Sequence, residues 1–419
     1  MRLISLAVGP AALLLGLAAG VAATASDVVM AASTLPASGP IPLPTPIPAP
    51  LAAEKLSIEV LPARSPHWVY VFDEAFFNET DMRVDLYDGD RHRLLGQIDA
   101  GYYAGVAVSP DHKTMAVATT YWSRGGHGTR SEVLEFTDTA TLAITNELVL
   151  PPKRAQGPPT LYNLQFSRDQ HLIYSTNLTP AASISVIDFD KRAVLSEIDS
   201  DGCVLAIPSL ERRVTSICEN GRLLSIIVDD NGKEVSRSLS AKFFDADKDP
   251  VFVQAVPSAT GVVFLSFHGA VHAVDLSGPE PKFAPSWSLA VPAKPRISVN
   301  GITAATGTTW RPGGTQMGAV HTSLSRLYVT MHEGVDGSHK SGGTEIFVHD
   351  LNSHSLLARW KIDTAKYGTA IAVQVSQDAK PLLFVATEHS FLLTLDALSG
   401  RFLHAEPKMG QSPWYLLNP

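Results

Sequence analysis

The sequence lacks the residues and motifs with which most enzymes carry out catalysis. Its 419 residues include only two cysteines, and these form neither a CxxC pair nor a metal-type spacing with histidine. The HExxH, GxSxG and phosphate-binding P-loop motifs are all missing. The 14 histidines are scattered along the chain, as is typical of solvated turn residues. These absences predict that the chain has no catalytic, cofactor-binding or metal-binding constellation of its own.

Positive charge is also scarce. The chain has 33 Lys and Arg against 41 Asp and Glu, which gives a net charge of −8 and a pI near 5.9. Proteins that bind nucleic acid usually present a basic face. We therefore predict no nucleic-acid partner.

The sequence does contain one pattern that is repeated seven times. Each unit has a short apolar strand ending in aspartate, then a polar turn, then a strand in which apolar and polar residues alternate. In the clearest unit, 346–362, Asp350 ends the first strand and Asn352 and Ser353 follow in the turn. The seven strand-end aspartates are Asp88, Asp138, Asp188, Asp229, Asp275, Asp350 and Asp396. We expect these carboxylates to be structural, because aspartate bonds readily to turn amides.

The spacing of the units predicts the fold class. Most intervals are about 40–50 residues, as expected for four strands per propeller blade. Another apolar strand precedes each unit, for example in 68–73 and 381–388. The interval between Asp275 and Asp350 is about 75 residues, which indicates an insertion. We predict an all-β, seven-bladed β-propeller with four-stranded antiparallel blades over residues 55–419; a β-sandwich is the alternative, but it gives no reason for the repetition.

The N-terminus has the composition of an export signal followed by a tether. Arg2 precedes a long apolar run, and the small residues 23–25 fit a cleavage site near Ala25. We interpret residues 1–25 as a removed signal peptide; a retained membrane anchor is the alternative, and stable membrane insertion is not expected. Residues 26–54 are rich in Ala, Ser and Pro, cannot bury a core, and are predicted to form a disordered arm.

The two cysteines, Cys203 and Cys218, flank a predicted pair of strands. In an antiparallel hairpin these positions can face each other, and an oxidising compartment would favour a disulfide. A bridge that closes a loop of about 15 residues would contribute roughly 3 kcal/mol in the chain-entropy picture. Two buried free thiols are the alternative.

Three segments contain candidate site residues. Phe76 and Phe77 are adjacent in a loop, so both cannot face one core if the chain is extended; one should be exposed or line a site, unless both fill the core. Trp310 and Arg311 lie in the insertion, where they indicate either a protein interface or a simple connection. Residues 123–130, SRGGHGTR, could bind an anion but are predicted to connect two strands.

Several segments together resemble a known family. They are YVFDEAFFNETDMRVDLYD from Tyr70, TTYWSRGGHGTRSEVLEF from Thr119, LPPKRAQG from Leu150, WRPGG from Trp310, HTSLSRLYV from His321, GSHK from Gly337, and the cysteine pair. With these segments, residues 56–419 are similar to the heavy subunit of quinoprotein amine dehydrogenases. LPPKRAQG and MHEGVDGSHK resemble the aromatic (aralkyl) amine dehydrogenase branch more than the methylamine branch.

The resemblance implies a seven-bladed propeller that pairs with a small, cysteine-rich light subunit in a heterotetramer of two heavy and two light chains. The cofactor tryptophan tryptophylquinone and the catalytic base would both lie on the light subunit. The assembly would oxidise primary amines to aldehyde and ammonia. Electrons would pass to a blue copper protein, such as azurin or amicyanin, in the periplasm.

The resemblance also implies roles for particular residues. One phenylalanine of the first-blade loop would line the substrate channel as a steric gate, and we favour Phe76 over Phe77. A light-subunit interface would involve the residues Trp310, Arg311, His339 and Lys340. The alternative function is a stand-alone exported propeller that binds a ligand or a protein.

Overall fold

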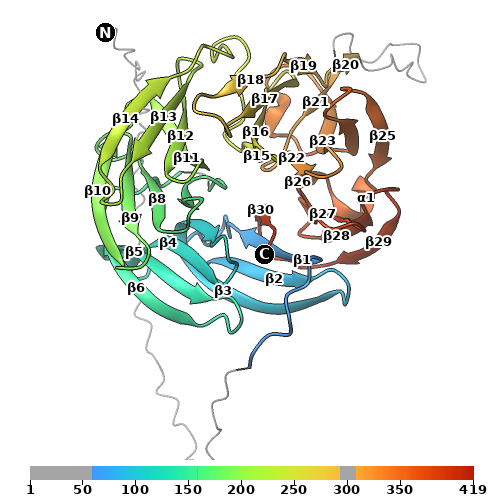
Figure 1. The fold of residues 1–419 in the computed structure, drawn as a ribbon. Coiled ribbons are helices and arrows are strands. Elements are labelled where there is room, and N and C mark those ends of the chain that lie inside the picture. The colour runs from blue at the N-terminus through green and yellow to red at the C-terminus, as the bar shows by residue number, and fades with distance from the viewer. Residues whose placement is uncertain (1–58, 158, 293–307) are drawn as a thin grey trace, which may run out of the picture. The chain divides into compact units, whose positions relative to one another are not determined.

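The computed structural model describes residues 59–157, 159–292 and 308–419, which belong to one compact all-β body (Figure 1). The predicted signal peptide and the predicted arm lie outside the described residues. The described residues form antiparallel strands, one short α-helix, α1 (Thr364–Tyr367), and one 3-10 turn, η1 (Ser338–Lys340). The all-β prediction is therefore confirmed.

The strands form six sheets among the described residues. The largest contains, in order, β30 (Pro413–Leu417), β1 (Trp68–Asp73), β2 (Met82–Asp88), β3 (Arg93–Val108), β4 (Thr114–Arg124), β5 (His127–Asp138) and β6 (Ile144–Leu150). The second contains β7 (Leu164–Phe166), β8 (Leu172–Asn177), β9 (Ser183–Asp188) and β10 (Ala193–Asp199). The third contains β11 (Cys203–Ser209), β12 (Arg213–Cys218), β13 (Leu223–Val228) and β14 (Glu234–Leu239).

The remaining three sheets complete the body. The fourth contains β15 (Val256–Pro257), β16 (Gly261–Leu265), β17 (Ala270–Asp275) and β18 (Lys282–Phe283), with β19 (Trp287–Ser288) beside β17. The fifth contains β20 (Val291–Pro292), β21 (Thr309–Pro312), β23 (Arg326–Gly334), β24 (Glu345–Asp350) and β25 (Leu356–Lys361), with β22 (Gly318–His321) beside β23. The sixth contains β26 (Ala370–Val375), β27 (Leu382–Thr387), β28 (Leu392–Asp396) and β29 (Phe402–Glu406).

Strand β3 belongs to two sets of strands. Its first part pairs with β2, as in Arg93 opposite Asp88, whereas its last part pairs with β4, as in Val108 opposite Met115. Gly101 lies between the two parts with φ +59°, a conformation that glycine adopts at little cost. Six sheets therefore contain all seven copies of the repeated hairpin.

The core lies between neighbouring sheets. Strands such as β1, β8, β12 and β27 are buried along their whole length, because both faces of the sheet pack against other sheets. The last strands of the sheets, such as β14 and β25, are mostly exposed. This explains why only the second strand of each repeat alternates between apolar and polar residues.

The seven strand-end aspartates have the structural role predicted for them. In each turn the carboxylate accepts a hydrogen bond from at least one backbone amide two to four residues later. Asp396, for example, accepts hydrogen bonds from the amides of Leu398 (3.0 Å) and Ser399 (2.9 Å). The aspartate thus fixes the turn that joins two strands.

The predicted disulfide is confirmed. Cys203 and Cys218 lie directly opposite each other in β11 and β12, and their sulfur atoms are bonded. The bridge joins the first two strands of the third sheet.

The two ends of the described chain meet in one sheet. β30 pairs with β1, and the rings of Phe72 and Tyr415 stack with centroids 4.5 Å apart and an angle of 3° between planes. Next to them, the Asp73 carboxylate accepts hydrogen bonds from the amides of Gln411 (2.7 Å) and Ser412 (2.6 Å). The last strand therefore closes the sheet that the first strand begins (Figure 1).

Truncation of Phe72 tests this closure. Both rings of the stack are fully buried, so Phe72→Ala should lower the free energy of unfolding by about 3–5 kcal/mol. The exposed Phe77 is a matched control, and its replacement by alanine should change stability by less than about 0.5 kcal/mol. Urea unfolding measures both changes. Equal effects of the two substitutions would contradict the assigned role of the stack.

The turn aspartates predict a dependence of stability on pH. The Ser399 backbone amide holds the pKa of Asp396 below its ordinary 3.8. The charged carboxylate therefore stabilises the fold above about pH 3.8, and this contribution is lost as the pH falls through the lower folded pKa. Asp396→Ala should cost about 1–3 kcal/mol at pH 7. The difference from the parent protein should shrink below pH 3.8 in thermal unfolding; a constant difference would be evidence against this mechanism.

Candidate functional site

The candidate site is built on the loop that joins β1 to β2, which contains Phe76 and Phe77. Asp73 begins the loop, and its carboxylate accepts a hydrogen bond from the Ala75 amide at 3.0 Å. Ala75 has φ +46°, which turns the chain sharply toward the surface. The Phe77 amide donates to the Gln411 side chain at 3.2 Å. The loop is therefore held by the segment that precedes β30.

Both phenylalanines are exposed. Phe76 is 56% exposed and Phe77 is 84% exposed, and their rings meet edge to face with centroids 5.6 Å apart. Exposed large apolar side chains of this kind mark contact or binding surfaces when they are grouped. The alternative that both fill the core is wrong.

A cavity of about 430 Å³ lies beside the two rings. Its wall is completed by Tyr102 of β3, Trp122 of β4 and Gly126 of the turn between β4 and β5. Segment 123–130 does connect two strands, as predicted, and it brings Gly126 to this cavity. Four aromatic side chains from three segments thus line one recess.

A buried arginine fixes the part of β3 that faces the cavity. Arg154 donates hydrogen bonds to the carbonyl oxygens of Tyr102 (3.1 Å) and Tyr103 and to the Thr120 hydroxyl (2.9 Å). Burial lowers the pKa of Arg154 to about 10, and the nearby Glu132 carboxylate opposes that shift. The cation therefore stays charged at neutral pH and holds the two tyrosine carbonyls in place.

The loop also contains a buried carboxyl group, that of Glu74. Its Oε2 atom has no hydrogen-bond partner among the described residues. Burial, together with the charges of Glu79 and Asp73, raises the pKa of Glu74 to about 7. On the other side, Glu79 accepts a hydrogen bond from the Tyr103 hydroxyl at 3.2 Å. Glu79 therefore lines the aromatic recess, and Glu74 is buried in the same loop.

The second group of predicted site residues lies on the fifth sheet. Trp310 and Arg311 are both 6% exposed; the Arg359 guanidinium covers the Trp310 ring at 4.4 Å. Arg311 pairs with the exposed Asp336 at 2.8 Å. The ring of His339 stacks on Phe267 at 3.8 Å.

In this group Lys340 is exposed, Arg311 is joined to the segment before η1 through Asp336, and Trp310 packs against Phe347 within the sheet. The light-subunit interface assigned to Trp310, Arg311, His339 and Lys340 stays a prediction. A direct contact with a partner would fall to Lys340 and to the part of His339 that Phe267 leaves open.

Several residues of the recess were not found from the sequence. Tyr102 and Trp122 are brought to the phenylalanines by strand pairing, and Arg154 lies more than 50 residues from the carbonyls it holds. The sequence did contain one signal for this recess, the adjacent pair Tyr102 and Tyr103. As with Phe76 and Phe77, two adjacent aromatic side chains in an extended chain cannot both face one core, so one of them should be exposed or line a site.

Within the described ranges, no group of three or more His, Cys, Asp or Glu side chains is placed to hold a metal ion. A helix long and apolar enough to cross a membrane is likewise not found in that part of the chain.

The successive antiparallel sheets and the closing strand define a protein of the β-propeller class. Among solved structures, a putative 6-phosphogluconolactonase from Bacteroides fragilis is similar, with a TM-score of 0.54, 12% identity, and coverage of 84% of this chain and 97% of that one. A dihydro-heme d1 dehydrogenase, NirN, has a TM-score of 0.52 at 17% identity, with coverage of 85% and 78%. At these identities the likeness concerns the fold alone.

The sequence comparison identifies the family. Residues 65–418 match the family described as methylamine dehydrogenase heavy chain, and this chain belongs to that family. The heavy chain from Methylophilus methylotrophus is 28% identical over 364 residues, which cover 86% of this chain and 85% of the relative. The heavy chain from Methylorubrum extorquens is 25% identical and covers 98% and 94% of the two chains.

Glu74 gives a testable pH dependence. Because its pKa rises from 4.5 to about 7 on folding, the unfolded state ionises first, so this carboxyl lowers stability as the pH rises from 4.5 to about 7. Glu74→Gln removes the charge. It should raise the melting temperature relative to the parent protein more at pH 8 than at pH 4.5. The exposed Glu219, changed to Gln, should show no such trend, and an identical trend in both variants would contradict the prediction.

Proposed function

We propose that this chain is the scaffold and channel-wall subunit of an exported amine dehydrogenase that oxidises primary amines to aldehyde and ammonia. The observation that carries the proposal is the exposed phenylalanine pair beside an aromatic recess, in a chain that belongs to this heavy-chain family. Exposed aromatic rings are unfavourable in water unless a partner or substrate covers them. A partner subunit set against this loop would enclose the recess as a channel.

The proposal assigns the redox chemistry to a light subunit. Tryptophan tryptophylquinone on that subunit would take up the two electrons of amine oxidation and pass them singly to a blue copper protein, such as azurin or amicyanin. The catalytic base would also lie there. The assembly would contain two heavy and two light chains in the periplasm, after cleavage of the signal peptide near Ala25.

In this assembly Phe76 would act as a steric gate. Its ring meets Phe77 edge to face and borders the recess, so its size would limit the amines that reach the partner subunit. Glu74 and Glu79 would favour the approach of a cationic ammonium group. Neither phenylalanine would take part in proton transfer, because a phenyl ring has no titratable proton.

Two finer points belong to the same proposal. Seven repeated hairpins in six sheets support seven blades, with β3 shared by the first two. The segments LPPKRAQG and MHEGVDGSHK, together with the aromatic side chains of the recess, support an aromatic (aralkyl) amine as substrate.

Co-expression with a light-chain gene tests the function. The chain alone should be colourless and inactive, whereas the complex should oxidise amines and show a quinone absorbance. If the purified chain oxidises amines alone, the subunit assignment is wrong. If it forms no complex and instead binds another ligand or protein, the stand-alone propeller is the better description.

Phe76 should control substrate choice in the complex. Phe76→Ala should shift the ratio of kcat/KM for 2-phenylethylamine over methylamine by about 10-fold or more, because a smaller side chain widens the passage. Phe77→Ala is the matched control and should change the ratio less. The reverse order of effects would assign the gate to Phe77. A higher rate with methylamine than with aromatic amines in the parent complex would overturn the aromatic-amine assignment.

A further inference from the structure

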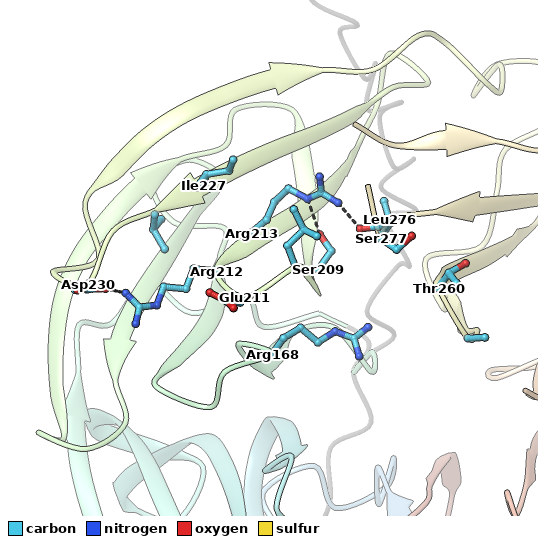
Figure 2. A pocket seen from close by; sticks show the side chains of 13 residues that line it. Arg168, Ser209, Glu211, Arg212, Arg213, Ile227, Asp230, Thr260, Leu276 and Ser277 are labelled. Atoms are coloured by element: carbon cyan, nitrogen blue, oxygen red, sulfur yellow. Dashed lines mark hydrogen bonds and ion pairs between the residues drawn. The ribbon is translucent and has the colours of Figure 1, made fainter. Parts of the chain in front are cut away.

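A second and larger cavity, of about 850 Å³, lies away from the phenylalanine loop (Figure 2). Its walls come from three successive sheets: Arg168 follows β7, Arg212, Arg213 and Ile227 belong to the third sheet, and Leu276 follows β17. The volume is in the range of small-molecule binding sites. Nothing in the proposed amine oxidation uses this cavity.

The wall of the cavity contains a buried cation, Arg213, which is only 2% exposed. Its guanidinium donates to the Ser209 hydroxyl (2.8 Å) and to the carbonyl oxygens of Gly278 and Pro279 (both 2.7 Å). It also donates to the Leu276 carbonyl. All these partners within the described residues are neutral oxygens, so the positive charge of Arg213 is hydrogen-bonded but is not balanced by a carboxylate.

A second cation, Arg168, extends into the same space. It is exposed, and its one hydrogen bond among the described residues is a long one, from Nε to the Pro208 carbonyl at 3.3 Å. Figure 2 shows its guanidinium pointing toward Thr260, apart from that of Arg213. Its terminal nitrogens are therefore available to a ligand.

The third arginine of the wall, Arg212, is held in ion pairs. It donates from Nε to Asp169 at 2.6 Å and pairs with Asp230, so these two carboxylates share the charge of one guanidinium. The residues lining the cavity include three arginines and the carboxylates of Glu211 and Asp230, and Asp169, which is bonded to Arg212, makes the numbers of the two signs equal. Among the described residues Arg168 and Arg213 form no ion pair, so these two are the cations without a carboxylate partner.

The rest of the wall is apolar. Leu210 and Ile227 are 41% and 39% exposed beside the arginines, and Val228 and Leu276 lie deeper. Water covers the exposed apolar surface in the free protein, and an apolar ligand group would displace that water favourably. The cavity thus offers a cationic end and an apolar wall.

We propose that this cavity binds a small organic anion, in which a carboxylate or phosphate head group contacts Arg168, the buried charge of Arg213 in the wall adds attraction, and a short apolar body covers Ile227 and Leu210. Guanidinium groups bind such head groups through paired, charge-assisted hydrogen bonds. The site is separate from the amine channel, so binding does not require the amine dehydrogenase assignment to hold.

Isothermal titration calorimetry on the full chain, in the form in which it purifies, tests the proposal. Phenylacetate is the probe, and phenylacetamide, which has the same body without the charge, is the matched neutral ligand. Phenylacetate should bind with a Kd of about 1 mM or below, and phenylacetamide should bind at least about 10-fold more weakly. Added NaCl should weaken the binding of phenylacetate only.

Variants locate the site. Arg168→Gln should weaken phenylacetate binding about 10-fold, and because Arg168 is exposed the fold should be unaffected. Arg401→Gln, at an exposed arginine before β29, should have no effect. Absence of binding at 10 mM phenylacetate, equal binding of the amide, or an unchanged Kd in Arg168→Gln would each overturn the proposal. Equal affinity for inorganic phosphate would overturn the role of the apolar wall.

Discussion

The pairing of β30 with β1 is the interaction on which the rest of the structure depends. Each sheet of a propeller buries its two faces against two neighbouring sheets. The first and last sheets must therefore pack against each other, or each would leave one apolar face exposed. Here one sheet takes its first strand from the C-terminus, and Phe72 and Tyr415 stack across the junction. Because these residues are more than 300 positions apart, closure requires the whole chain, and such non-local pairing forms slowly.

The candidate site is attached to this junction. Asp73 holds the amides of Gln411 and Ser412, and Gln411 in turn accepts a hydrogen bond from Phe77. The loop that presents the two phenylalanines is therefore positioned by the same contacts that close the sheet. Stability and function are still separable, because the rings themselves are exposed and contribute little to folding. Substitutions at these exposed rings should therefore leave the scaffold intact.

The two cavities differ in the sign of the charged side chains near them. At the phenylalanine loop Glu79 lies beside aromatic rings, with Glu74 buried in the same loop, a combination that suits a cationic amine. In the larger cavity Arg168 and Arg213 lie next to aliphatic side chains, a combination that suits an anion. The two proposed ligands have opposite charge, and one scaffold can offer both sites because each depends on a few side chains at strand ends and turns.

Sequence reasoning succeeded wherever the cause was local. The repeated hairpins with their turn aspartates follow from strand alternation and from carboxylates that bond nearby amides. The pairing of Cys203 with Cys218 follows from a hairpin of short span. Two adjacent rings in one loop indicated that one phenylalanine is exposed or lines a site, and in the structure both are exposed. Sequence reasoning failed where contacts join residues that are distant in sequence. The residues around Arg154 and Trp122 do not indicate the recess, and the sequence around Trp310 and Arg311 does not indicate that these two side chains are buried.

By itself, the sequence determined that the chain is a series of antiparallel hairpins, because hydrophobic alternation and turn chemistry act over a few residues. Only the tertiary structure decided which hairpins become neighbours, that β3 serves two sets of strands, and which side chains meet in the cavities. The reason is physical: packing between sheets depends on side chains that come together in space from distant segments, and no local pattern encodes that meeting.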